Sequence, residues 1–335
     1  MKVTIKDVAK AAGVSPSTVS RALQNNNRIS PEVRARVQQV AREMDFHPNQ
    51  MARSLVSRQS RIIGIVFPSD MSMNLGNPFY PLVLEGLGHT ASENHYHILL
   101  ITGSESVSAA EASREAIDSG YVSGLITLAA ENAPTEKPPL PMVVLGHPID
   151  PMNCCSVDND NVRLGYEATR YLLSRGHERI LLVGYDERYM FTVDRRAGYE
   201  KALTQAGLSL RSNWIVTNAM MRNPQEHEQL SRLFRDEGRP TAAVCMDDEQ
   251  AIGMEHLLDS IGLKVPQDVS IIGVNNTEAS RYHHPPLTTI DVHPYQLGVH
   301  AMNLMLDMLN EKVTAPSSVT VPFTLMERQS VADIR

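Results

Sequence analysis

The chain has 335 residues with 31 basic and 38 acidic side chains, which give a formal net charge of −7. This length exceeds what one compact core usually holds, so we expect a small domain followed by a body of two subdomains. The three cysteines exclude a disulfide framework and lack metal-ligand spacing, and no apolar stretch is long enough to span a bilayer. The chain starts in an amphipathic segment and not in a secretory signal, so we expect a cytoplasmic protein.

Residues 3–23, VTIKDVAKAAGVSPSTVSRAL, predict two short capped helices joined by a turn at Gly13. Thr4 begins a capping-box pattern for the first helix, and Ser15 with Pro16 fits the start of the second. This is the pattern of a helix-turn-helix, which places its second helix in the DNA major groove. A capped helical hairpin of some other domain remains the alternative.

The second helix keeps hydroxyls and one guanidinium on its outer face after its apolar residues pack inward. These residues are Ser17, Thr18, Ser20 and Arg21. Hydroxyls bond phosphates or base edges, and arginine donates two parallel hydrogen bonds to guanine.

A third helix begins at Ser30-Pro31, with apolar residues at helical spacing up to Met44, and closes a three-helix core. Proline at position 48 ends this domain, and residues 49–60 form a linker that is marginal as an isolated helix. Residues 1–60 carry a net charge of +6, so the remainder carries −13. A basic head on an acidic body indicates a nucleic-acid partner at one end only.

The body alternates short apolar runs with helical patterns. The expected strands are 61–68, 97–103, 124–129 and 142–146, and then 179–185, 241–246 and 269–274. Helices are expected between them, around 80–93 and 107–119 in the first half. The fold class is therefore α/β, with a helix-turn-helix head and two doubly wound parallel-sheet subdomains. Ligands bind beyond the carboxyl ends of such strands, so the two subdomains should face each other across a cleft.

The chain resembles the LacI/GalR family of bacterial transcription regulators over nearly its whole length. The resemblance rests on TIKDVAKAAGVSPSTVSRAL and HPNQMARSL and, towards the maltose-operon regulators of Gram-positive bacteria, on ARSLVS, NPFYPLVLEGL, ASENHY and VDNDN. It implies a DNA-binding domain at 1–48, a hinge at 49–60 and a periplasmic-binding-protein-like body at 61–335. The implied N-subdomain comprises 61–160 and 294–321, and the implied C-subdomain comprises 163–290 and 324–335.

The resemblance also implies an effector site between the subdomains. Arg195, Asp247 and Asn275 match family effector positions, with Tyr80 and Asp160 from the other subdomain. Phe79 and Tyr189 are aromatic neighbours at predicted strand ends, and the set suits a neutral polyol. Purely structural roles remain the alternative for several of these residues. Asp247 or the adjacent Asp248 could cap a helix, Asn275 could serve turn geometry, and Phe79 or Tyr80 could pack beneath its helix.

The implied mechanism is control of DNA binding by a ligand. Two chains form a homodimer through helices near 80–93 and 250–262 and bind a palindromic operator. Ser17 and Arg21, with Pro16 beside them, should face bases. The candidates for phosphate contacts are Thr4, Ser15, Thr18, Ser20 and Asn25. The hinge from Asn49 should fold on DNA, with Leu55 as a wedge between base steps and Arg53 against phosphate. Packing of Leu55 against its own head is the alternative.

Two kinds of effector remain open on the sequence. The first is an inducing sugar, maltose or a related α-glucoside, and the second is a corepressor, either a nucleobase or a phosphoprotein. We expect no catalytic residues, cofactor or metal, since His283-His284 lacks a third ligand at metal spacing. A cytoplasmic, nucleoid-associated repressor is the resulting hypothesis.

Overall fold

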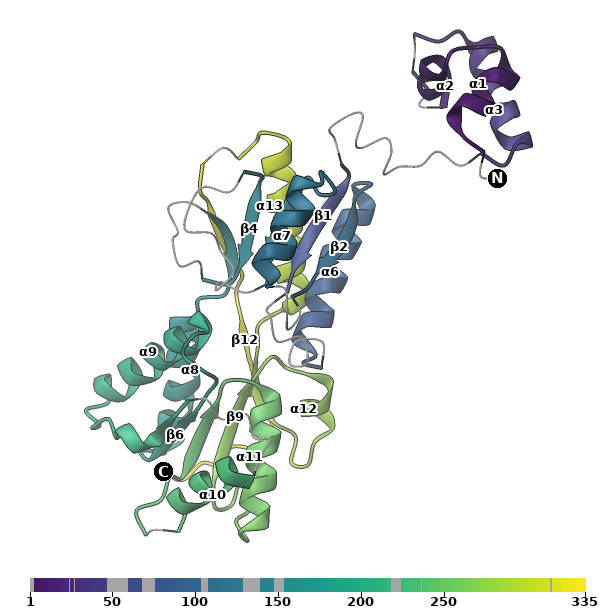
Figure 1. The fold of residues 1–335 in the computed structure, drawn as a ribbon. Helices are drawn as coiled ribbons and strands as arrows, with labels where there is room; N and C mark the ends of the chain where they lie inside the picture. The colour runs from purple at the N-terminus through teal and green to yellow at the C-terminus, as the bar shows by residue number, and fades with distance from the viewer. Residues whose placement is uncertain are drawn as a thin grey trace. The chain divides into compact units, whose positions relative to one another are not determined.

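The computed structural model describes residues 3–23, 25–26, 28–46, 60–67, 76–103, 108–128, 139–147, 154–217, 224–235, 237–313 and 315–335. The chain divides into two compact units, Met1–Ser60 and Arg61–Arg335, which we call the head and the body (Figure 1). The predicted hinge residues Asn49, Arg53 and Leu55 lie outside the described residues. No helix within the described ranges is long and apolar enough to cross a membrane.

The head contains the three expected helices, α1 (Ile5–Ala12), α2 (Pro16–Leu23) and α3 (Pro31–Glu43). Val8, Val19 and Val37 contribute one side chain from each helix to the core and are fully buried. Gly13 ends α1 with a φ of 64°, a left-handed conformation in which a side chain would be strained. The prediction of a small three-helix domain is confirmed.

The first sheet of the body runs in the order β11-β5-β4-β3-β1-β2, and all of its pairings are parallel. Its strands are β1 (Ile62–Val66), β2 (His97–Ile101), β3 (Gly124–Thr127), β4 (Met142–Leu145), β5 (Cys155–Asp158) and β11 (Ser318–Thr320). Helices α6 (Phe79–Glu93) and α13 (Pro294–Leu309) cover one face, and α7 (Ala109–Asp118) covers the other. This sheet and its helices are the N-subdomain.

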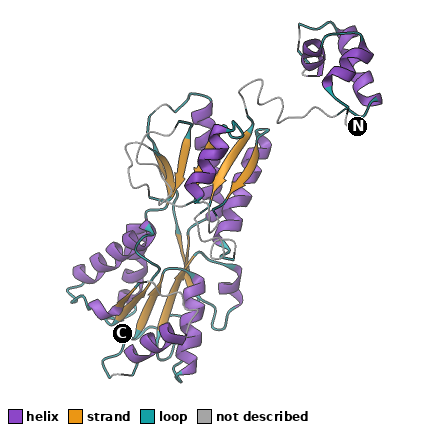
Figure 2. Ribbon diagram, viewed as in Figure 1, coloured by secondary structure: helices purple, strands orange, loops and turns teal. Residues whose placement is uncertain are grey.

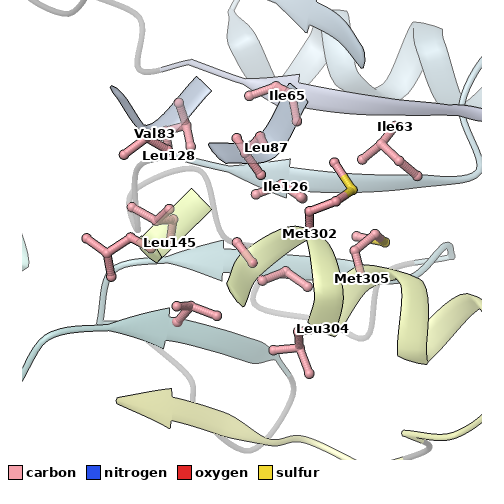
Figure 3. Close-up of a cluster of buried hydrophobic side chains, with 14 of the residues drawn as sticks. Ile63, Ile65, Val83, Leu87, Ile126, Leu128, Leu145, Met302, Leu304 and Met305 are labelled. Atoms are coloured by element: carbon pink, nitrogen blue, oxygen red, sulfur yellow. The ribbon is translucent and has the colours of Figure 1, made fainter. Parts of the chain in front are cut away.

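The core of the N-subdomain lies between α13 and the strands. Figure 3 shows Met302 and Met305 of α13 beside Ile126 of β3 and Ile63 of β1, and all four side chains are fully buried. Burying side chains of this size contributes about 1.5–3 kcal/mol each. The helix α13 therefore belongs to the N-subdomain, although it follows the strands of the second sheet in sequence.

The second sheet runs in the order β12-β10-β9-β8-β6-β7, parallel except for the antiparallel pair of β10 with β12. Its strands are β6 (Ile180–Val183), β7 (Ile215–Val216), β8 (Ala242–Cys245), β9 (Ser270–Val274), β10 (Thr288–Asp291) and β12 (Thr324–Met326). One face is covered by α8 (Asn161–Ser174) and α9 (Met190–Gln205), and the other by α10 (Pro224–Leu233) and α11 (Asp248–Ser260). Together with α12 (Glu278–Tyr282), these elements form the C-subdomain (Figure 2).

The chain crosses between the two sheets three times, after β5, after β10 and after β11. The amide of Asn159 in the first crossing donates to the carbonyls of Val292 (3.2 Å) and Val321 (2.9 Å) in the other two. Asn159 is buried, so its hydrogen bonds are not exchanged with water and tie the crossings together. The predicted fold class, with two parallel-sheet subdomains, is confirmed.

Candidate functional site

The outer surface of the head presents the predicted DNA-binding residues of α2. Ser15, Pro16, Ser17 and Arg21 are exposed, and Thr18 and Ser20 are half-buried. The Ser15 hydroxyl accepts from the Thr18 backbone N–H (3.2 Å) and bonds the hydroxyls of Ser17 (2.8 Å) and Thr18 (2.9 Å). These bonds cap α2 and align the hydroxyls at its start.

Two further residues of the head that are predicted to contact phosphate form hydrogen bonds with other side chains of the head. The exposed Thr4 hydroxyl donates to Asp7 Oδ2 (2.7 Å), and this bond helps to lower the pKa of the Asp7 carboxyl. The Gln38 amide donates to Asn25 Oδ1 (2.9 Å), and Asn25 adopts a left-handed φ of 54°. The structure therefore places both residues at helix ends on the exposed surface of the head.

In the body, Arg195 is fixed on α9 at the boundary between the subdomains. Its Nε donates to Asn161 Oδ1 (2.9 Å), and its Nη1 donates to the carbonyl of Met246 (2.5 Å). The guanidinium also lies over the ring of Phe191, 5.1 Å from its centre. Burial lowers the pKa of Arg195 to about 10, against the opposing charges of Asp158 and Asp247, so it remains a cation at neutral pH.

Close contact between α8 and α9 allows Arg195 to reach this position. A Cβ at Gly165 of α8 would lie 2.0 Å from the Arg195 carbonyl oxygen, so a side chain there would push α9 away. The helices thus pack backbone against backbone, as small residues permit. Asn161, at the start of α8, is thereby brought to the guanidinium.

Asp247 follows β8 and is almost completely buried, with 3% of its surface exposed. Its Oδ1 accepts from the Gln250 N–H (2.8 Å) and caps α11, as one alternative predicted. Its Oδ2 accepts from the Tyr185 hydroxyl (2.5 Å) and from the Asn77 amide (2.9 Å). Burial raises the pKa of Asp247, and the bonds from these donors oppose that rise.

Asp248 has a different role from the cap expected as an alternative. It is fully buried and accepts hydrogen bonds from the Thr277 N–H (2.7 Å), the Thr277 hydroxyl (2.9 Å) and the Thr289 hydroxyl (2.5 Å). Burial raises the pKa of Asp248 to about 6. The cap falls to Asp247 because that residue has the extended backbone of an N-cap.

Aromatic rings gather at the strand ends of both subdomains. Phe79 meets Tyr80 edge to face, with ring centres 5.2 Å apart, and Phe79 packs against the cores of both subdomains. Tyr189 stacks on Phe191 at 5.6 Å with an interplanar angle of 20°. Both predicted aromatics of α6 therefore take part in packing, and Tyr189 forms part of an aromatic pair beside Arg195.

The structure gives Asp160, a predicted effector contact, the role of a helix cap. This residue is exposed, and its carboxylate caps α8 by accepting from the Arg163 N–H (2.8 Å). Asp158, two residues earlier at the end of β5, is the carboxylate near Arg195. Burial raises the pKa of Asp158 to about 6, although the Asn159 N–H and the charge of Arg195 lower it. Asp158 is the last residue of β5, whereas Asp160 is the N-cap of α8 and its carboxylate is used by that helix.

Asn275 follows β9 in an unusual backbone conformation, with a φ of 103°. Its N–H donates to the Ile290 carbonyl (2.8 Å), while its side-chain amide forms no hydrogen bond with the described part of the chain. The residue as a whole is 9% exposed, and its side-chain amide can both donate and accept hydrogen bonds. Turn geometry explains its backbone but leaves its side chain available.

The predicted effector-binding set did not include four residues that the structure brings to this boundary. They are Asn77, Asp158, Asn161 and Tyr185. Asn77, Asp158 and Tyr185 follow or end strands, so the strand-end rule contained a signal for them. Asn161 carried no such signal, because its contact with Arg195 depends on how α8 packs on α9.

A second contact links the subdomains beyond the crossings. His147 follows β4, and its Nδ1 lies 2.8 Å from Asp194 Oδ2 on α9.

Among the described residues, no group of three or more His, Cys, Asp or Glu is placed to hold a metal ion. His283 instead pairs with Glu255, with Nε2 and Oε2 2.7 Å apart.

Two family models match the chain. Residues 4–49 match the model described as bacterial regulatory proteins, lacI family. Residues 169–331 match a periplasmic binding protein-like domain. The first covers the head, and the second covers most of the C-subdomain together with α13.

Similar proteins cover nearly the full length of the chain. The HTH-type transcriptional regulator MalR of Streptococcus pneumoniae serotype 4 is 36% identical over 321 residues, covering 93% of this chain and 94% of the relative. The HTH-type transcriptional repressor PurR of Erwinia tasmaniensis is 31% identical over 338 residues, covering 98% and 97%. The lac repressor dimer bound to operator and the anti-inducer ONPF has the same fold, with a TM-score of 0.83 at 24% identity, covering 99% of this chain and 100% of that one.

Proposed function

Because the chain belongs to the lacI family of bacterial regulatory proteins, which are transcriptional regulators and not enzymes, we propose that it is an effector-controlled repressor. The proposed effector is a small carbohydrate, maltose or a related α-glucoside, bound between the two subdomains. Similarity to MalR over most of both chains supports this choice.

The observation that carries the proposal is the guanidinium of Arg195 beside aromatic faces at the boundary, with the carboxylate of Asp247 near enough for its charge to act on Arg195. A carboxylate accepts from sugar hydroxyls and a guanidinium donates to them, while aromatic rings cover the C–H surfaces of the sugar. Asn275 adds an amide that can donate and accept. We propose effector contacts from Phe79, Tyr80, Tyr189, Arg195, Asp247 and Asn275, and Asp158 in place of Asp160.

A nucleobase corepressor is the second candidate. Similarity to PurR covers 98% of this chain, and the stacked pair of Tyr189 and Phe191 offers the flat surface that a base requires. The two candidates predict opposite responses, because a corepressor tightens operator binding and an inducer loosens it.

For DNA binding, we propose that Ser17 and Arg21 read bases and that hydroxyls around them contact phosphates. Within the head, residues 1–48 would form the DNA-binding domain and residues 49–60 the hinge, with Leu55 as the wedge. Two chains would place two heads on a palindromic operator.

The proposed homodimer has support in the body. Leu82 of α6 and Leu99 and Leu100 of β2 are 38%, 37% and 46% exposed. In the C-subdomain, Tyr282 at the end of α12 is 80% exposed. Exposed apolar side chains grouped on neighbouring elements are typical of interfaces between chains.

Fluorescence anisotropy on a palindromic operator selected from random DNA, at fixed salt, tests the function. Maltose, other α-glucosides, galactosides and purines are titrated into the preformed complex. Release by maltose or another α-glucoside supports the sugar repressor, and tightening by a purine supports the second candidate. Failure of the protein to select any operator contradicts the proposal as a whole.

A further inference from the structure

The two subdomains are joined by a direct hydrogen bond whose geometry is set by a helix cap. Asn77 lies just before α6, and its Oδ1 accepts from the Phe79 N–H at 3.0 Å. This bond fixes the side-chain amide, so its Nδ2 points away from the helix and donates to Asp247 Oδ2 at 2.9 Å. The residues lie 170 positions apart, one in each subdomain.

Of the three described donors to Asp247, Asn77 is the one that belongs to the other subdomain. Tyr185 and Gln250 both come from the C-subdomain, and so they stay with Asp247 however the subdomains move. Separation of the subdomains would therefore remove one donor from a carboxylate that is 3% exposed. Loss of a hydrogen bond to a buried charge is more costly than loss of one between neutral groups.

Outside the three crossings and the Asn161–Asp158 bond beside the first of them, the other described bond across the boundary is weaker. His147 and Asp194 are 2.8 Å apart, but the His147 side chain is 48% exposed. Ion pairs in contact with solvent contribute little because water and salt screen them. The bond from Asn77 to Asp247 is therefore the stronger of the two.

We propose that Asn77 is a positioning residue for effector control, whose amide joins the two subdomains before any effector binds. An effector that binds between joined subdomains has its apparent affinity reduced by the fraction of molecules in which they are apart. Asn77 thus increases effector affinity by increasing the joined fraction. This inference rests on the proposed function only where it concerns the effector.

Two substitutions separate the cap of α6 from the bond across the boundary. Asn77→Asp keeps an oxygen for the Phe79 N–H but places a second carboxylate against Asp247. Asn77→Ser also keeps a capping oxygen but is too short to reach Asp247. The matched control is Asn94→Asp, because the Asn94 amide donates to Thr90 O within α6 and does not cross the boundary.

The first measurement needs no effector. Spin labels are placed by Tyr121→Cys in the N-subdomain and Leu210→Cys in the C-subdomain, two positions that are each 45% exposed, whereas the native cysteines are buried. Pulsed electron paramagnetic resonance on the full chain, diluted with unlabelled protein, reports the distance between the labels. Asn77→Asp and Asn77→Ser should lengthen or broaden this distance, while Asn94→Asp should leave it unchanged. An unchanged distance in both Asn77 variants overturns the proposal.

A pH profile of the same distance excludes a general loss of structure. On acidification, the new carboxyl of Asn77→Asp gains a proton and can donate to Asp247, so its distance should return towards that of the unsubstituted chain. Asn77→Ser has no such group and should not recover. It also controls for the other groups near the pair that can gain a proton on acidification, which include Asp158, Asp248, Glu249 and the pair of His147 with Asp194, whereas Tyr185, Tyr80 and Arg195 already hold their protons. Equal recovery of both variants contradicts the proposal.

The second measurement uses maltose as the probe. Both Asn77 variants should weaken maltose binding, on the order of tenfold, with Asn94→Asp unchanged. Altered distances with unchanged maltose affinity overturn the effector part of the proposal. If the unsubstituted chain does not bind maltose, the proposed sugar is wrong, and the effector-free distances still decide the role of Asn77.

Discussion

The head and the body hold their functional residues in place by different means. In the head, the hydroxyls at the start of α2 are positioned by neighbours within a few residues, as Ser15 is by Ser17 and Thr18, and Asn25 is bonded by Gln38, 13 residues away. In the body, Asp247 is bonded by Tyr185, 62 residues away, and by Asn77, 170 residues away. Local capping therefore determines the surface of the head, whereas the packing of distant elements determines the site in the body. Substitution of a functional residue in the head should therefore affect only its own contact with DNA. Substitution in the body should also affect the packing of elements that are distant in sequence.

The largest effect is expected at Arg195. Arg195→Ala removes the cation between Asp158 and Asp247 and the donor to Asn161, so the effector response should be lost while the effector-free protein still binds operator. Anisotropy titrations with and without effector measure the effector response and the operator affinity of the effector-free protein. The control is Arg196→Ala, since Arg196 bonds Glu187 and Glu200 near the surface and should leave the response intact. A retained response in Arg195→Ala contradicts the proposed site.

Asp248 should make the stability of the body depend on pH. Its pKa of about 6 in the folded chain exceeds the ordinary value of 3.8, so the folded state holds this proton more tightly than the unfolded state. Stability from this group is fully present below about pH 4 and is lost as pH rises through 6, by about 3 kcal/mol.

Urea unfolding of the chain and of Asp248→Asn between pH 4 and 7 measures this difference. The free energy of unfolding of the unsubstituted chain should fall relative to that of Asp248→Asn as pH rises, because the amide cannot ionise. Asp118→Asn, at an exposed position, is the control. A constant difference across this range contradicts the assignment.

Arg21 should have a smaller and purely local effect. Arg21→Ala should reduce discrimination between operator variants by about 1–3 kcal/mol if the guanidinium contacts a guanine in two places. The exposed Arg42 of α3 provides a variant with the same change in charge, Arg42→Ala, which should weaken all sequences alike. Equal preferences across operator variants in Arg21→Ala would remove this residue from base reading.

The smallest effect is expected at His147. His147→Ala removes a solvent-exposed contact with Asp194 across the subdomain boundary and should change effector affinity by less than about 1 kcal/mol. Isothermal titration on this variant and on His89→Ala, whose partner Glu93 lies on the same helix, provides the comparison. A larger loss at His147 would make this pair, and not the bond from Asn77, the main link between the subdomains.

The apolar runs of the sequence predicted most strands and helices of the body correctly, but they did not predict several short strands. β10 and β12 were not among the expected strands, and β12 has only three residues, one of them exposed. Such segments form because a neighbouring strand supplies hydrogen bonds, as β10 does for β12. Their own residues carry too little apolar pattern to indicate a strand.

The residue pattern alone was enough to predict the head, the alternation of strands and helices in the body, and the strand ends at which Asp247 and Asn275 lie. These features depend on residue type and short spacing, which determine caps, turns and buried faces. The residue pattern was not enough to predict that Asp158 lies near Arg195 while Asp160 caps α8, or that Asn77 reaches Asp247. Those contacts depend on the contact between α8 and α9 and on the three crossings that orient one sheet on the other, and no local pattern encodes either.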